Sequence, residues 1–129
     1  MEDRIIYKDL CYKLNGIFFK VHNELGRFAR EKQYADLAED YFKKSGIKYK
    51  REFEIEFVGQ EKSIGGNRVD FLVENKIIVE FKVKSFVSRD NYIQVQRYLQ
   101  ASNLKLGLLI NFNQRYIKPR RIINSNAKE

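Results

Sequence analysis

The chain has 129 residues, of which 43% are hydrophobic and 14% aromatic, and its formal net charge is +8. This length and apolar content fit a single globular domain over residues 1–129 and exclude an intrinsically disordered chain. One cysteine and one histidine exclude a disulfide framework and an ordinary structural zinc site, and no apolar run is long enough to cross a bilayer. Because the charged start MEDRIIYKDL lacks the apolar region of a signal peptide, we expect a cytoplasmic protein without a membrane partner.

The first half of the chain predicts two helices and a strand. Apolar residues at helical spacing predict helices over residues 7–25 and 29–44, with Gly26 as the stop signal of the first. A half-buried strand is predicted over residues 49–58, where Phe53, Ile55 and Phe57 alternate with glutamates. The stretch 59–66 has the composition of a turn.

Two short apolar runs, residues 68–73 and 77–84, predict a β-hairpin around Glu74-Asn75-Lys76. We expect Val69, Phe71 and Val73 to share one face of its first strand. Matching that face to the apolar face of the second strand requires partner numbers with an even sum, such as 71 with 79. This register leaves a three-residue loop or a bulge at the turn.

The same register places Asp70 beside Glu80 and Lys82 on the opposite face of the hairpin. Two neighbouring carboxylates can share a hard divalent cation such as Mg²⁺, which prefers oxygen ligands and lowers the pKa of bound water. A lysine beside them can orient or deprotonate that water and stabilise the negative charge that develops. The spacing alone leaves open the alternative of a cross-strand salt bridge without catalytic function.

The rest of the chain predicts one more helix and two strands. Ser88 can cap a helix over residues 89–102, and the apolar run KLGLLINF, residues 105–112, is typical of a strand buried on both faces. A last strand over residues 116–123 is expected at a sheet edge because Pro119 cannot donate to a neighbour. This order of elements predicts an α/β or α+β fold with a mixed sheet.

The positive charge is concentrated in the second half of the chain. Residues 1–64 hold 13 basic and 12 acidic side chains, whereas residues 65–129 hold 12 basic and 5 acidic ones. A basic half indicates an anionic partner, most commonly nucleic acid, although a solubilising surface is an alternative. The basic residues that could contact a nucleic-acid backbone include Lys84, Arg68, Arg115, Lys118, Arg120 and Arg121. We therefore expect basic residues around an acidic pocket.

The segment RVDFLVENKIIVEFK, residues 68–82, resembles motifs II and III of the PD-(D/E)XK nuclease superfamily, with Val69 in place of the proline. More narrowly, HNELG followed by Glu31-Lys-Gln-Tyr34, the segment Gln94-Val-Gln-Arg-Tyr98, and LKLGLLINF are similar to the GxxExxY group of small prokaryotic proteins assigned to that superfamily. The resemblance runs from about residue 6 to residue 123. Phe28 stands where the motif of this group has its leading glycine.

The resemblance implies an α/β fold with a restriction-endonuclease-like core, a mixed four-stranded sheet flanked by helices. It implies a nuclease that hydrolyses phosphodiester bonds in DNA, or less commonly in RNA. The cofactor would be Mg²⁺, with Mn²⁺ as a substitute. Its ligands would be Asp70, Glu80, the backbone carbonyl of Phe81, and Glu31 directly or through water.

The resemblance also assigns catalytic and binding residues. Lys82 would be the catalytic lysine that acts on the attacking water, with Glu31 and Gln94 beside the reacting groups. Tyr98, on the same helix as Gln94, would border the site and contact nucleic acid. Many nucleases of this fold act as homodimers to cut both strands, so a homodimer is an open alternative here. Two other functions stay open: a catalytically silent nucleic-acid-binding or regulatory module, and an interaction subunit of a larger system.

Overall fold

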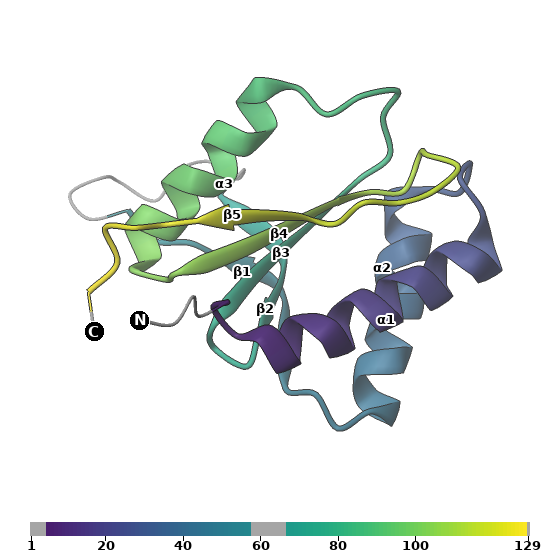
Figure 1. The fold of residues 1–129 in the computed structure, drawn as a ribbon, viewed down its shortest axis with the longest axis horizontal. Coiled ribbons are helices and arrows are strands. Elements are labelled where there is room, and N and C mark those ends of the chain that lie inside the picture. Colours follow the sequence, from purple (N-terminus) through teal and green to yellow (C-terminus); the bar gives the residue numbers. More distant parts are fainter. Residues whose placement is uncertain (1–4, 58–66, 129) are drawn as a thin grey trace.

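The computed structural model describes residues 5–57 and 67–128, which form a five-stranded sheet flanked by helices (Figure 1). The helices are α1 (Lys8–Leu25), α2 (Glu31–Lys44) and α3 (Arg89–Ser102), and the strands are β1 (Tyr49–Glu54), β2 (Arg68–Val73), β3 (Ile77–Lys82), β4 (Leu106–Asn111) and β5 (Arg120–Ile123). The predicted α/β class is confirmed. Residue 58 and the predicted turn at 59–66 lie outside the described residues.

The strands follow each other in the order β1-β2-β3-β4-β5, and only β3 and β4 run parallel. A parallel pair needs a crossover connection, and α3 supplies it. As predicted, β4 is buried along its whole length and β5 lies at the sheet edge. β5 begins only at Arg120, directly after Pro119, and adds a fifth strand to the four-stranded sheet that the resemblance implies.

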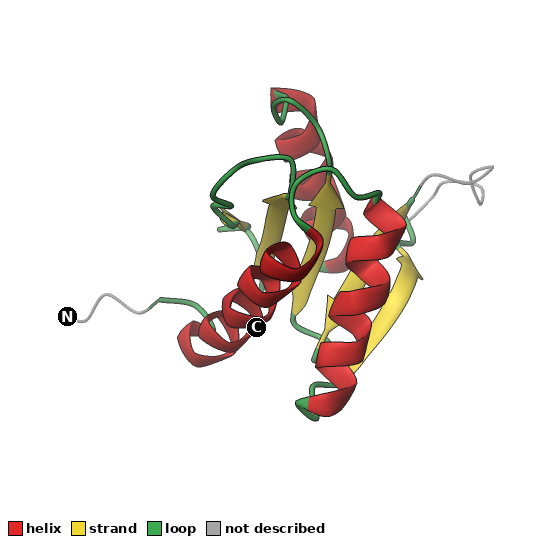
Figure 2. Cartoon of the chain, turned by 90° about the vertical axis from the view of Figure 1, so that its right-hand side faces the viewer, coloured by secondary structure: helices red, strands yellow, loops and turns green. Residues whose placement is uncertain are grey.

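The two faces of the sheet carry cores of different composition. Helices α1 and α2 cover one face, while α3 covers the other (Figures 1 and 2). The α1/α2 core is rich in aromatic rings and includes Phe18, Tyr34, Phe42, Phe71, Phe81 and Phe112. The α3 core is smaller and mainly aliphatic, and includes Val69, Leu72, Ile78, Val95, Leu99 and Leu109. None of the described helices is both long and apolar enough to span a bilayer.

The ends of the helices follow local sequence signals. Gly26 ends α1 with a φ of 73°, a left-handed conformation that glycine adopts without strain, and its N–H donates to the carbonyl of His22. Ser88 precedes α3 as predicted, and its N–H donates to Oδ1 of Asn91 at 3.1 Å. The first turn of α3 is therefore anchored to the loop that follows β3.

The β2–β3 hairpin has the predicted register, with Phe71 opposite Val79. Glu74 and Asn75 have φ values of 54° and 56°, as a type I′ turn requires, and the N–H of Lys76 donates to the carbonyl of Val73 at 2.9 Å. Regular pairing between β2 and β3 ends after Phe71. From that point β2 continues beside β1 only, and β3 continues beside β4 only.

The prediction that Val69 shares a face with Phe71 and Val73 is wrong. Phe71 and Val73 lie in the α1/α2 core, whereas Val69 packs in the α3 core. The neighbouring strand β1 shows the same exchange, because Tyr49 packs on the α1/α2 core and Phe53 on the α3 core. Between those two residues the backbone of Glu52 has a φ of 51°, which interrupts the regular alternation of faces.

Candidate active site

Asp70 and Glu80 meet at the point where β2 and β3 separate. The N–H of Asp70 donates to Oε1 of Glu80 at 2.7 Å, and the N–H of Phe81 donates to Oδ2 of Asp70 at 2.7 Å. Side-chain-to-backbone hydrogen bonds thus take the place of regular β2–β3 pairing here. Each carboxylate is held by the backbone of the opposite strand, and the predicted proximity of Asp70 and Glu80 is confirmed.

Burial makes two negative charges at this point unfavourable. Glu80 has only 6% of its surface exposed. Burial, followed by the charge of Asp70, raises the pKa of Glu80 to about 8. Burial also raises the pKa of Asp70, and the charge of Glu31 adds to this effect. The positive charge of Lys82 opposes both shifts. Without a cation, the carboxylate pair therefore holds a proton up to about pH 8.

Lys82 and Glu31 approach this pair from different elements. Lys82 is the last residue of β3, is half-buried, and follows Glu80 on the same face of the strand. Glu31 is the first residue of α2, is exposed, and lines a groove of about 340 Å³ together with Asp70. The structure therefore brings all four predicted acidic and basic groups to one region, with Asp70 and Glu80 in its buried centre.

The oxygen atoms of this site fit a hard divalent cation. Asp70 and Glu80 each use one carboxylate oxygen to accept a backbone N–H, and a hydrogen bond also joins the two side chains. Carboxylate and carbonyl oxygens are the ligands that Mg²⁺ prefers, and a cation would offset the repulsion between the two buried groups. Within the described residues, no three His, Cys, Asp or Glu side chains form a complete metal site by themselves. Glu31 thus lies near Asp70 and Glu80 but does not complete a metal site with them.

Helix α3 contributes Tyr98 and Gln94. Tyr98 is 1% exposed, and burial, followed by the nearby charge of Glu80, raises the pKa of its hydroxyl. Gln94 is half-buried and lies one helical turn before Tyr98, on the same side of α3. The helix thus packs Tyr98 close to the acidic pair, and Gln94 lies further toward the end of α3 that follows β3.

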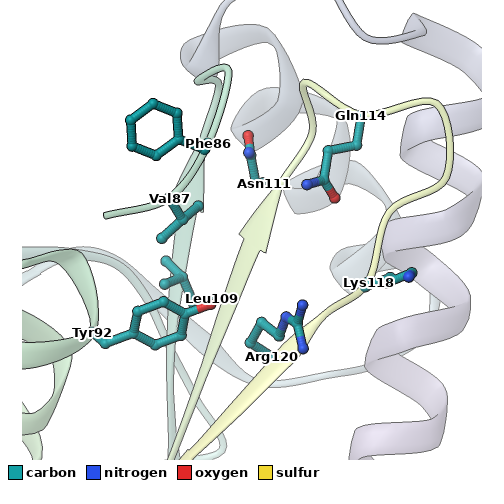
Figure 3. Close-up of a pocket in the computed structure, with 8 residues that line it drawn as sticks. All are labelled: Phe86, Val87, Tyr92, Leu109, Asn111, Gln114, Lys118 and Arg120. Atoms are coloured by element: carbon teal, nitrogen blue, oxygen red, sulfur yellow. The ribbon is translucent and has the colours of Figure 1, made fainter. Parts of the chain in front are cut away.

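Three of the predicted nucleic-acid contacts line two different pockets. Arg68 lines the groove that contains Glu31 and Asp70, with a 3.7 Å ion pair to Glu52. Lys118 and Arg120 line a separate pocket of about 140 Å³ on the α3 face of the sheet (Figure 3). Arg68 thus shares a groove with Asp70, whereas the pocket of Lys118 and Arg120 is separate from the acidic pair.

The other three basic residues are engaged elsewhere. Arg121 follows Arg120 on β5 and therefore points to the opposite face of the sheet. There its guanidinium donates to Sγ of Cys11 at 3.2 Å and to the carbonyl of Ile6 at 3.1 Å, which ties β5 to the start of α1. Arg115 lies 5.4 Å from the ring centre of Tyr116. Lys84 donates to Oδ1 of Asn91 at 3.4 Å.

Asn111 is a residue of this region that the sequence analysis did not identify. It lies opposite Lys82 in the β3–β4 register and is 5% exposed. Its Oδ1 accepts the N–H groups of Lys84 at 3.1 Å and Asn113 at 3.2 Å, and its Nδ2 donates to the carbonyl of Lys84 at 2.9 Å. The available signal was an asparagine at the end of the apolar run LGLLIN, because a buried amide needs hydrogen-bond partners.

A comparison with known families supports the resemblance of the motifs. The sequence model of the PD-(D/E)XK nuclease superfamily matches residues 8–123, a range that contains every helix and strand described above. The three helices and the five-stranded mixed sheet agree with the restriction-endonuclease-like fold of that superfamily. No curated protein and no solved structure gives a significant match to the chain.

Proposed function

Because the chain belongs to the PD-(D/E)XK nuclease superfamily, we propose that it is a Mg²⁺-dependent nuclease that hydrolyses phosphodiester bonds in DNA. The observation that carries this proposal is the meeting of Asp70 and Glu80 where β2 and β3 separate, with Lys82 next on the same face of β3. A salt bridge between neighbouring strands would not require two carboxylates to be buried side by side. The burial of this pair therefore favours a site that receives positive charge.

We also propose, from Glu31 and Tyr34, that the chain belongs to the GxxExxY group. Tyr34 stacks on Phe112 with ring centres 4.2 Å apart, and its hydroxyl donates to the carbonyl of Gly26. The same hydroxyl accepts the N–H of Ala29 at 3.3 Å. Tyr34 thus holds the turn that leads into Glu31 without any contribution from a glycine at position 28. The side chain of Phe28 is exposed, so this departure from the motif leaves the turn intact.

Hydrolysis requires a water oxygen to bond to phosphorus while an ester P–O bond breaks and a proton reaches the leaving oxygen. A cation held by Asp70, Glu80 and the carbonyl of Phe81 would supply positive charge that offsets the charge of the phosphate. Lys82 would orient the attacking water and stabilise the negative charge as it grows. The hydrogen bonds from the backbone fix both carboxylates before substrate binds, which reduces the reorganisation needed for reaction.

The proposal is tested by incubating the full-length protein with end-labelled single-stranded and double-stranded DNA, in Mg²⁺, in Mn²⁺ and in EDTA. We expect cleavage with either metal and none in EDTA. Glu80→Gln and Lys82→Met should each lower the cleavage rate by at least about 100-fold, because each removes a charge that stabilises the transition state.

Two exposed residues provide matched controls for these variants. Glu54→Gln changes an outward glutamate of β1, and Lys76→Met changes a lysine in the turn at the other end of the hairpin. Both should cleave at the wild-type rate. Cleavage that survives EDTA or the two site substitutions would overturn the proposal. Metal-independent DNA binding without cleavage would instead identify a catalytically silent module of the same fold.

A further inference from the structure

The pocket that contains Arg120 lies on the same face of the sheet as Glu80 and has a different chemical character. Arg120 and Gln114 lie on one side of it, and Phe86, Val87 and Tyr92 lie on the other (Figure 3). Asn111 lies between the two sides, with its amide already engaged by the backbone of Lys84 and Asn113. The groups that remain for a ligand are therefore the cations and the aromatic rings.

Among the described residues, the two cations of this pocket have no acidic partners. No aspartate or glutamate lines the pocket, and within the described parts of the chain neither Lys118 nor Arg120 forms an ion pair. By contrast, Arg51 is held by two carboxylates of α2 at 2.7 and 2.9 Å. Arg120 thus offers the pocket uncompensated positive charge, which favours an anionic ligand, whereas the side chain of Lys118 points away from the pocket (Figure 3).

The register of the sheet fixes the position of this charge relative to the candidate active site. Glu80 pairs with Leu109, and Leu109 pairs with Arg120, so the three residues form a row across β3, β4 and β5. Neighbouring strands are about 4.8 Å apart, which places Arg120 about 10 Å from Glu80 on the same face. A phosphate bound by Arg120 would therefore belong to a nucleotide that lies near the cleaved nucleotide on the same strand.

An aromatic side chain is presented beside this charge on an anchored loop. The side chain of Phe86 is 73% exposed, although the loop that carries it is fixed at both ends. Asn111 holds both backbone groups of Lys84, and Asn91 accepts the N–H of Ser88. A fixed loop with an exposed ring is suited to stack against a flat partner with little loss of conformational entropy.

Two further exposed aromatic residues lie on loops that contact each other. Tyr116 lies in the segment between β4 and β5, and Phe28 lies in the turn between α1 and α2. Nδ2 of Asn113 donates to the carbonyl of Arg27 at 3.1 Å, so these two segments are in contact. The loops around the carboxyl ends of β3 and β4 thus combine positive charge with exposed rings.

We propose that the pocket between α3, β4 and β5 binds a backbone phosphate of single-stranded nucleic acid, with Phe86 stacking on an adjacent unpaired base. The inference rests on the proposed nuclease function and specifies its substrate as a single strand. Stacking on an exposed aromatic ring requires a base that is not paired within a duplex, and every base can provide such a flat face. The pocket then holds the strand in register with Asp70 and Glu80, and no base-specific contact is needed.

The test is a binding measurement that does not depend on cleavage. Fluorescence anisotropy is measured in EDTA with the Glu80→Gln variant and a labelled 12-nucleotide single strand, as DNA and as RNA, and with a DNA duplex of the same sequence. We expect tighter binding of at least one single strand than of the duplex. The DNA and RNA arms identify which sugar the site accepts.

Substitutions in the pocket separate its two contributions. Arg120→Gln, added to Glu80→Gln, should weaken single-strand binding about 10-fold and reduce the slope of log K against log salt by about 0.7, the loss of one phosphate contact. Phe86→Ala should weaken single-strand binding at least about fivefold without changing that slope or the affinity for duplex. Lys128→Gln, an exposed lysine near the C-terminus, is the matched control and should bind as the parent does.

The outcomes distinguish this inference from the proposed function. Metal-dependent cleavage by the wild type, combined with unchanged binding by Arg120→Gln and Phe86→Ala, would overturn the inference and leave the nuclease proposal standing. Single-strand binding that depends on both residues, in a protein that cleaves nothing, would support the pocket and overturn the nuclease proposal. Equal losses for duplex and single strand would contradict the single-strand assignment.

Discussion

The two faces of the sheet are held together in different ways. On the α1/α2 face, buried aromatic rings contact each other edge-on, and Phe71 lies 5.0 Å from Phe42 and 5.8 Å from Phe81 between ring centres. On the α3 face, the aliphatic core is interrupted by Glu80 and Asn111, whose positions depend on hydrogen bonds. One face thus provides most of the apolar stabilisation, and the other carries the polar groups suited to chemistry.

Strand β3 belongs to both faces at once. Its alternate residues Ile77, Val79 and Phe81 anchor it in the α1/α2 core, while Glu80 and Lys82 point to the opposite side. The ring of Phe81 is buried, and its backbone N–H donates to Asp70. The packing of these apolar side chains on one face therefore fixes the backbone of β3. That backbone in turn holds Asp70 on the other face by a hydrogen bond. Substitutions on either face should lower the free energy of unfolding by different amounts, except Glu80→Gln, which should raise it.

The largest loss of stability is expected for Phe71→Ala in the α1/α2 core. Its side chain is fully buried, so truncation should lower the free energy of unfolding by about 3–5 kcal/mol. Urea denaturation followed by circular dichroism measures this change. Phe19→Ala, at a half-exposed phenylalanine of α1, is the control and should change stability by less than about 1 kcal/mol. Equal losses for the two variants would contradict the central place of Phe71 in that core.

A smaller loss is expected for Asn111→Ala, because the polar face depends on its hydrogen bonds. The substitution leaves three backbone groups of Lys84 and Asn113 without their partner, which should lower the free energy of unfolding by about 1–3 kcal/mol. Amide hydrogen exchange at those two positions should also become faster. Asn23→Ala, at an exposed asparagine of α1, is the control. Unchanged exchange at Lys84 would show that Asn111 does not hold the loop.

The opposite sign is expected for Glu80→Gln in metal-free protein. Since the pKa of Glu80 is about 8 in the folded state and 4.5 ordinarily, the folded state binds more protons than the unfolded state between those values. Wild-type stability should therefore fall as pH rises from 4.5 to 8, and then stay level. Between pH 4.5 and pH 8, the free energy of unfolding of Glu80→Gln should therefore rise relative to that of wild type by at least about 1.4 kcal/mol, the equivalent of one pKa unit.

Thermal denaturation in EDTA at pH 5 and at pH 8 measures this difference between variant and wild type. Glu54→Gln on β1 is the matched control and should show no such gain. Adding Mg²⁺ at pH 8 should raise the melting temperature of wild type more than that of Glu80→Gln, because ligand binding stabilises the folded state. A variant that is less stable than wild type at pH 8 would contradict the predicted repulsion at the carboxylate pair.

The smallest effect is expected for Gly107→Ala, where α3 packs closely on β4. A Cβ atom at this position would lie 2.7 Å from Cγ1 of Val95, so the helix or the valine must move, at an expected loss of about 1 kcal/mol. Gly16→Ala is the matched control, because a Cβ atom there meets no atom within 4 Å. In the interior of α1 that substitution should instead stabilise the protein by about 0.5–1 kcal/mol. A gain in stability for both variants would show that α3 has room to shift.

The proximity of Asp70 and Glu80 was predictable because the parity of hairpin pairing sets Phe71 opposite Val79, and Asp70 and Glu80 are the next residues on the two strands. Apolar residues at every second position select the register, and the register then places the two carboxylates opposite each other. The same reasoning was wrong for Val69, because the exchange of faces at Glu52 and Asp70 depends on how β1 and β2 pack between two different cores. The helices and strands were therefore predictable over most of their length. Which face of the sheet each side chain of β1 and β2 occupies beyond the distortion at Glu52 and Asp70 was not predictable.

The sequence by itself determined the helices, the strands and the hairpin register, since each follows from periodicity within a short stretch of chain. It also carried the family motif, which is a resemblance of particular residues in the segment 68–82. Only the tertiary structure decided that Arg120 reaches a pocket on the same face of the sheet as Glu80 while Arg121 is engaged with α1. It alone decided the hydrogen bonds of Asn111 and the exposure of Phe86 as well. These depend on contacts between segments far apart in the chain, and such contacts are set by the packing of helices on the sheet.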